Sequence, residues 1–139
     1  MRIVLALGML LAACGTAAAQ DAGPTTVAGP PSSQKCAAVY GAFAQEQAAF
    51  GTTDSLMGER YFNYAKINFS DRLTQLAGKS EMGIADLKNA SAVDESNYYM
   101  KLVDAETDGD MDVPPVRDMV GVSDTCDAEY GFDPSLGGG

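Results

Sequence analysis

KCAAVYGAFAQEQAAF, residues 35–50, is the stretch from which the fold is predicted. Its cysteine and its larger apolar side chains recur at spacings of three, four and seven residues, the period of one face of an α-helix. These residues are Cys36, Val39, Tyr40, Phe43 and Phe50. Gly51 follows at once, and glycine commonly ends a helix because it tolerates the left-handed backbone of a C-cap. The pattern predicts an amphipathic helix from Lys35 to Phe50.

Three later stretches repeat this helical spacing. The second runs from about residue 55 to residue 77 and is followed by Gly78 as its stop. The third begins after Ser80, a suitable N-cap, and has a weakly helical middle over residues 89–96. The fourth opens at residues 114–115, two prolines that fit the first turn of a helix. We find no convincing run of alternating β-branched residues, so the sequence favours helices over strands.

Four amphipathic helices joined by short turns predict an all-α fold, a small antiparallel four-helix bundle with up-down-up-down topology over residues 34–133. This topology places the start of the first helix and the end of the fourth at the same end of the bundle. Cys36 and Cys126 stand at those two places in the sequence. We therefore predict that they form one disulfide that closes the bundle. Residues 134–139 are predicted to be a flexible tail.

The N-terminus has the pattern of an export signal. Residues 1–2, Met-Arg, give a short positive start, and residues 3–13 form an apolar run broken only by one glycine. This run is too short to span a bilayer, which takes about 20 apolar residues in a helix. One interpretation places the cleavage after residue 19, because Ala-Ala-Ala at residues 17–19 suits an ordinary signal peptidase. That cleavage would release a soluble, secreted form.

The second interpretation rests on Leu-Ala-Ala-Cys at residues 11–14, which resembles the lipobox of bacterial lipoproteins. The resemblance implies a lipoprotein signal over residues 1–13, cleavage just before Cys14 and lipidation of Cys14. Residues 14–33 are rich in Gly, Ala, Pro, Ser and Thr, and this composition predicts a disordered tether. A flexible chain of this length spans about 24 Å root-mean-square, enough to hold a domain away from a membrane surface.

Charge and composition exclude several classes of function. The chain of 139 residues has a formal net charge of −10, which argues against a nucleic-acid partner. It contains no histidine, so catalysis by Ser-His-Asp or Cys-His systems is excluded, as are sites in which histidine binds zinc or haem. The acidity is local, because residues 80–139 hold 14 acids against three bases, a charge of −11. This half favours either a solvated acidic face or a site for a cation or a basic partner.

One acidic segment has the spacing of a metal-binding loop, with oxygen ligands at every second position. Its acids are Asp104, Glu106, Asp108, Asp110 and Asp112. The segment resembles the first nine positions of an EF-hand loop, and the resemblance implies calcium held by the first three side chains, the Asp110 carbonyl and Asp112, directly or through water. At the twelfth position, where that family has a bidentate glutamate, stands Pro115. The alternative is a solvated turn whose acids complement the dipole of the fourth helix.

Three functions from different classes follow. The first is a small exported bacterial envelope protein, a lipid-tethered helical module that binds an envelope protein or another envelope component without catalysis. It would be located in the periplasm or anchored to the outer membrane, would contact the membrane only through its lipid, and would need no cofactor. The second is a periplasmic protein that binds calcium weakly through residues 104–112. The third is a small cell-wall hydrolase that uses paired carboxylates for acid-base catalysis.

The calcium hypothesis has a direct test. Without a bidentate ligand, residues 104–112 should bind calcium with millimolar affinity at best. Millimolar Ca²⁺ should then raise the melting temperature of the protein, since a ligand that binds only the folded state stabilises it. The Asp108→Ala variant should lose that increase. No thermal shift in the unaltered protein would leave these acids as a solvated connection between helices.

Overall fold

The computed structural model describes residues 31–137, and within them the chain is helical without any strand. The elements are α1 (Ser33–Phe50), α2 (Leu56–Arg60), the 3₁₀ turn η1 (Tyr64–Lys66), α3 (Phe69–Lys79), α4 (Ile84–Asp108) and α5 (Pro114–Tyr130). The predicted all-α class is therefore confirmed. The export signal, Cys14 and nearly all of the predicted tether lie outside the described residues.

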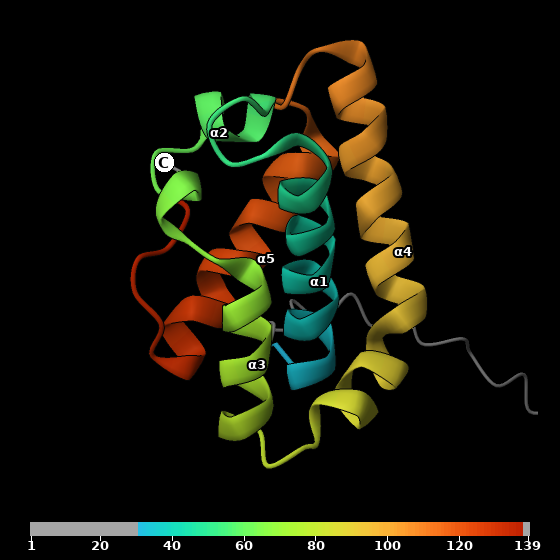
Figure 1. The fold of residues 1–139 in the computed structure, drawn as a ribbon, viewed down its shortest axis with the longest axis vertical. Coiled ribbons are helices and arrows are strands. Elements are labelled where there is room, and N and C mark those ends of the chain that lie inside the picture. The colour runs from blue at the N-terminus through green and yellow to red at the C-terminus, as the bar shows by residue number, and fades with distance from the viewer. Residues whose placement is uncertain (1–30, 138–139) are drawn as a thin grey trace, which may run out of the picture.

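Helix α1 lies at the centre of the molecule, between α4 on one side and α3 and α5 on the other (Figure 1). Residues 36–43 are buried without interruption, so α1 is enclosed around its whole circumference for about two turns. The predicted arrangement of four amphipathic helices in an up-down-up-down bundle is not confirmed. Helix α1 is enclosed rather than amphipathic, and its most extensive contact is with α4.

Small side chains on α1 make this enclosure feasible. They belong to Ala37, Ala38, Gly41 and Ala42. The carboxyl group of Glu95, a residue of α4, packs against Gly41. A Cβ atom at position 41 would overlap that group. Gln45, one turn further along α1, donates a hydrogen bond to the same carboxylate. Because neighbouring backbones approach closely where side chains are small, the four positions allow α1 to be covered by several helices at once.

The continuous helix predicted over residues 55–77 is wrong. The chain forms α2, η1 and α3 there, and both helices have their own side-chain N-cap. The Ser55 hydroxyl accepts a hydrogen bond from the Gly58 N–H at 3.0 Å. The Asn68 side chain accepts one from the Asp71 N–H at 3.1 Å. Each cap satisfies a backbone donor that has no partner inside its own helix, so two helix starts replace one long helix.

A side chain of α1 holds the segment between α2 and α3. Gln47 donates to the backbone oxygen of Ile67 at 2.7 Å and accepts from the Phe69 N–H at 3.2 Å. The break also changes which aromatic rings are buried. Tyr64 is fully buried, whereas Phe62, two residues earlier, is 79% exposed.

Helix α4 is continuous through the predicted weak middle and ends at Asp108, where Gly109 adopts a left-handed φ of 73°. The turn predicted to begin at Asp104 is therefore wrong, because the helix extends past it. The start of the last helix at Pro114 is as predicted. Proline suits this position because it has no N–H and the first helical N–H groups lack partners within the helix.

The C-terminal segment packs against the domain. Leu136 is fully buried, and its N–H donates to the Asp124 carboxylate at 2.7 Å. Arg72 of α3 donates to the backbone oxygen of Pro134 at 3.2 Å. The prediction of a flexible tail from residue 134 is therefore wrong for residues 134–137, which the structure describes. A single buried leucine with two backbone contacts is enough to order so short a segment.

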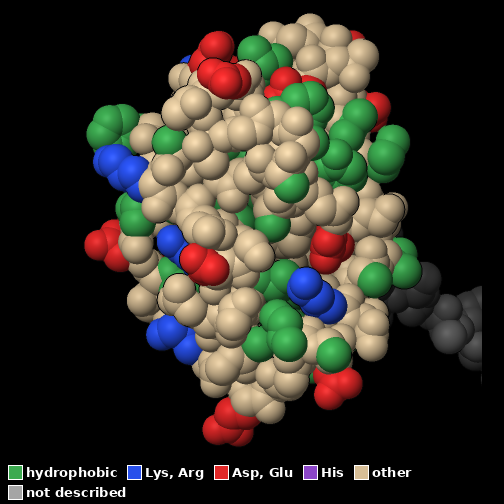
Figure 2. All heavy atoms as spheres, viewed as in Figure 1, with side chains coloured by type: hydrophobic (Ala, Val, Ile, Leu, Met, Phe, Trp, Pro, Cys, Tyr) green, Lys and Arg blue, Asp and Glu red, His purple; other side chains and the backbone are tan. Residues whose placement is uncertain are grey.

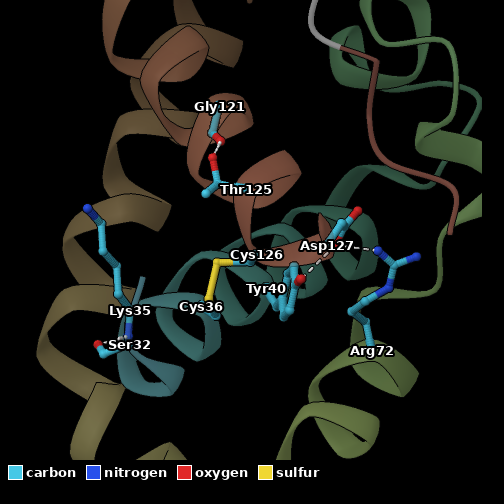
Figure 3. Close-up of a disulfide and its surroundings, with 9 residues drawn as sticks. All are labelled: Ser32, Lys35, Cys36, Tyr40, Arg72, Gly121, Thr125, Cys126 and Asp127. Atoms are coloured by element: carbon cyan, nitrogen blue, oxygen red, sulfur yellow. Dashed lines mark hydrogen bonds and ion pairs between the residues drawn. A yellow bond between two sulfur atoms is a disulfide. The ribbon is translucent and has the colours of Figure 1, made fainter. Parts of the chain in front are cut away.

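The predicted disulfide is confirmed, and it joins buried residues Cys36 of α1 and Cys126 of α5 (Figure 3). The next residue along α5, Asp127, accepts a hydrogen bond from the Tyr40 hydroxyl at 2.6 Å. The Asp127 carboxylate also pairs with Arg72 of α3 at 2.5 Å (Figure 3). Burial raises the pKa of Asp127, while the hydrogen bonds from Arg72 and Tyr40 oppose that increase. A covalent bond and a buried ion pair thus hold α1, α3 and α5 together at one end.

The disulfide should contribute a large share of the net stability. The two cysteines are 90 residues apart, and closing a loop of that size stabilises by about 4–5 kcal/mol in the chain-entropy model. A small domain has a total stability of only about 5–15 kcal/mol. We predict that mature protein carrying Cys36→Ser is substantially unfolded at 37 °C by circular dichroism, whereas Cys14→Ser melts like the unaltered chain. A melting curve that reductant leaves unchanged would contradict this prediction.

Candidate binding site

The structure disperses the acids that were proposed as calcium ligands. Asp104 and Asp108 are exposed on α4, whereas Glu106 is half-buried and contacts the start of α2. Asp110 accepts a hydrogen bond from the Asp112 N–H, and the Asp112 carboxylate pairs with arginines. Within residues 31–137, no group of three or more acids or cysteines is placed to hold a metal ion. Calcium binding stays a prediction. The described residues do not bring its predicted ligands together.

Glu106 belongs to a pair of carboxyl groups between α1, α2 and α4. Its carboxylate accepts a hydrogen bond from the Leu56 N–H at 3.1 Å. Beside it lies Glu46 of α1, which is fully buried. Burial and the adjacent Glu106 carboxyl raise the pKa of Glu46 to about 8, although the Ser55 hydroxyl acts in the opposite direction. The Glu46 carboxyl therefore keeps its proton at neutral pH, because an ionised group there would be desolvated beside a second acid.

A hollow of about 330 Å³ opens on the same end of the molecule. Arg60, the last residue of α2, and Arg117, in the first turn of α5, line it from two sides. The rest of its lining consists of Tyr61, Asp112, Val120, Gly121 and Gly137. Its volume lies within the range of small-ligand sites, roughly 300–1,000 Å³. We take this hollow as the candidate binding site.

Both arginines are paired with the same carboxylate. Arg60 Nη2 lies 2.9 Å from Asp112 Oδ2, and Arg117 Nη1 lies 3.2 Å from Asp112 Oδ1. Among the residues that the structure describes, Asp112 is the one acid within ion-pair distance of either guanidinium. The three side chains are 42% to 55% exposed, and ion pairs this exposed contribute about 0–1 kcal/mol to stability. Since each guanidinium has five N–H donors, most donors are left for a ligand.

Tyr61 forms part of the wall beneath the arginines. Its hydroxyl donates a hydrogen bond to the backbone oxygen of Met111 at 3.2 Å, which anchors the loop that carries Asp112. Burial raises the pKa of Tyr61, with the charge of Arg60 acting against the increase. The hydroxyl therefore stays a neutral donor and holds the loop in place over the whole physiological pH range.

A second hollow, of about 450 Å³, is also lined by basic residues: Lys66, Arg72 and Lys79. Figure 2 shows Lys and Arg side chains on this face, with acidic side chains between them. These cations already have partners. Lys66 lies over the Phe62 ring, and both Arg72 and Lys79 lie over Phe132. Because Arg72 is also buried against Asp127, this hollow leaves fewer free donors than the Arg60–Arg117 hollow.

Sequence reasoning missed the two arginines of the candidate site. They lie 57 positions apart, and only the fold brings both of them to the carboxylate of Asp112, in the loop before α5. One signal was available, because Arg117 is the only arginine in the acidic residues 80–139. Arg117 is one of three basic residues among these 14 acids, so its position was a candidate for a specific acidic partner.

No protein-family model matches the chain. No match was found among the curated proteins or among the solved structures. None of the helices within residues 31–137 combines the length and the apolar character that crossing a bilayer requires.

The Glu46 carboxyl predicts a specific pH dependence of stability. Its pKa is about 8 in the folded protein and has an ordinary value of 4.5 when the chain is unfolded. The folded state therefore binds more protons across this window, so the contribution of Glu46 to stability falls as the pH rises from 4.5 to about 8. Glu46→Gln removes this titration, and its melting temperature relative to the unaltered protein should rise with pH and level off above about pH 8.

The measurement is a series of thermal melts between about pH 4 and pH 9. Glu129→Gln, at an exposed position on α5, is the matched control and should show no such trend. The buried Asp127 titrates in both proteins, so its effect cancels in the difference. A difference between Glu46→Gln and the unaltered protein that is constant over the whole range would show that Glu46 has the same, ordinary pKa in the folded and unfolded states.

Proposed function

We propose that the protein is a small exported bacterial envelope protein, a lipid-tethered helical module that binds another envelope component and has no catalytic activity. The observation that carries this proposal is the lipobox-like Leu-Ala-Ala-Cys at residues 11–14, placed before a disulfide-closed domain. If Cys14 carries the lipid, two of the three cysteines remain, and these two form the disulfide.

The disulfide supports export. Disulfides form and persist in the periplasm and outside the cell, whereas reducing systems in the cytoplasm keep thiols reduced. The Cys36–Cys126 bond joins the first and last helices of the domain, so its loss would affect the whole fold rather than a loop. A chain that depends on such a bond for stability is suited to an oxidising compartment.

The composition between Cys14 and α1 supports tethering. A lipid-anchored domain needs a spacer to stand clear of the membrane surface, and a Gly/Ala/Pro/Ser/Thr segment is a usual composition for one. Helix α1 begins at Ser33, with the Ser32 hydroxyl accepting a hydrogen bond from the Lys35 N–H at 3.2 Å. The folded domain thus begins where that composition ends.

The candidate site supports binding over acid-base catalysis. Guanidinium groups remain protonated at physiological pH, so Arg60 and Arg117 can hold an anion but cannot accept a proton. The paired carboxyls, Glu46 and Glu106, give little support to the alternative of a cell-wall hydrolase. A catalytic acid must reach its substrate, and Glu46 is fully buried while Glu106 is hydrogen-bonded to the start of α2.

Lipid labelling tests this proposal in cells. The unaltered protein should incorporate radiolabelled palmitate, fractionate with membranes, and accumulate as a precursor in the presence of globomycin. Cys14→Ser should lose the label and the membrane association, because the cysteine thiol is the attachment point that the lipobox resemblance implies. Thr16→Ala, two residues away, is the control and should be labelled normally. Palmitate incorporation that persists in Cys14→Ser would reject lipidation at that residue.

A further inference from the structure

We propose that the Arg60–Arg117 hollow binds the C-terminal carboxylate of a peptide. This inference rests on the proposed binding function and adds to it the chemical class of the ligand. Three observations carry it: the geometry of the arginine pair, the shape of the surface beside it, and the charge of the surrounding chain.

Asp112 shows what the arginine pair accepts. Each of its two oxygens is within 3.2 Å of a different guanidinium, so a carboxylate fits between Arg60 and Arg117 with one oxygen toward each. Arginine prefers carboxylates in this manner because its planar fork of donors matches the two oxygens. Asp112 itself is 42% exposed and belongs to a short loop, so it can share the two guanidiniums with a ligand or give way to it.

The surface beside the arginines has room for the residues that precede a peptide carboxylate. A third hollow, also of about 450 Å³, shares Arg117 and Gly121 with the Arg60–Arg117 hollow and continues along α5. Val122 and Thr125 line it, together with one further base and one acid, Lys35 and Asp118. Val120 and Gly121 give the wall of the first hollow a small, partly apolar surface. A bound peptide whose C-terminal residues lie across Arg117 would contact both hollows.

The charge distribution favours this position over others. Residues 80–139 hold a charge of −11, so an anionic peptide end is repelled from most of that half of the molecule. At the hollow, two arginines oppose the single charge of Asp112. A carboxylate is therefore attracted to this one position, and a peptide whose carboxyl group is blocked loses the attraction.

The test compares N-acetyl-alanyl-alanine with its C-terminal amide, titrated into the ¹⁵N-labelled mature protein and followed by NMR. The free acid should bind with roughly millimolar affinity and shift the amides of residues around Arg117, and the amide should bind about tenfold more weakly or not at all. Arg60→Gln and Arg117→Gln should each lose binding by a similar factor. Both variants should fold, because the exposed ion pairs that they remove contribute little to stability.

Asp112→Asn separates this proposal from a purely structural role. Removing the internal carboxylate frees donors on both guanidiniums, so the variant should bind the free acid several-fold more tightly than the unaltered protein. Asp108→Asn removes the same charge from an exposed position on α4 and is the matched control, with unchanged affinity expected. A merely structural ion pair would produce no gain of binding in Asp112→Asn.

Three results would overturn the proposal: equal binding of the acid and the amide, no gain of binding in Asp112→Asn, or inorganic phosphate binding more tightly than the free acid. The last result would assign the hollow to phosphate groups instead. The NMR titration uses purified protein without a lipid, so its failure leaves the palmitate result unaffected. Failure of labelling at Cys14, in turn, leaves the ligand class of the hollow unaffected.

Discussion

The enclosure of α1 between residues 36 and 43 constrains every other element of the fold. A helix without a solvent face must be covered by several neighbours, and α4, α3 and α5 all pack on it. Polar contacts hold the enclosed helix at both of its ends. Near its start, the Cys36–Cys126 bond and the Tyr40–Asp127 hydrogen bond tie it to α5. Near its end, Gln47 binds the backbone between η1 and α3, so the covering segments are held in register with α1.

This constraint also explains which features the sequence could predict. Helix boundaries set by local chemistry were predicted, such as the stop at Gly51 and the start at Pro114, because caps act through neighbouring residues. The Cys36–Cys126 bond was predicted from composition, since only two cysteines remain after Cys14 is set aside. Features decided by distant contacts were missed. The break after α2 depends on Gln47, about 20 residues earlier, and the burial of the C-terminal segment depends on Asp124 and Arg72.

For the same reason, the sequence predicted only part of the candidate site. The alternating acids of residues 104–112 indicated oxygen ligands for a cation, but helix α4 extends to Asp108 and separates their side chains. Glu106 and Asp112 contact α2 or its arginine instead, a helix that periodicity had merged into a longer one. In the structure, Glu106 accepts a hydrogen bond from the start of α2. Asp112 pairs with two arginines, one of which is the last residue of α2. Merging α2 into a longer helix therefore hid the partners of Glu106 and Asp112.

Near α2, the acids of residues 80–139 have specific partners. Two of these acids gather around α2 together with Glu46 of α1, and each of the three is compensated by a different means. Glu46 keeps its proton because burial raises its pKa, Glu106 accepts a backbone N–H bond, and Asp112 is shared by two arginines. The remaining positive charge therefore belongs to Arg60 and Arg117, and it faces solvent. In a chain with a net charge of −10, the proposed carboxylate site would depend on these two arginines, because the acids of residues 80–139 repel an anion elsewhere on that half.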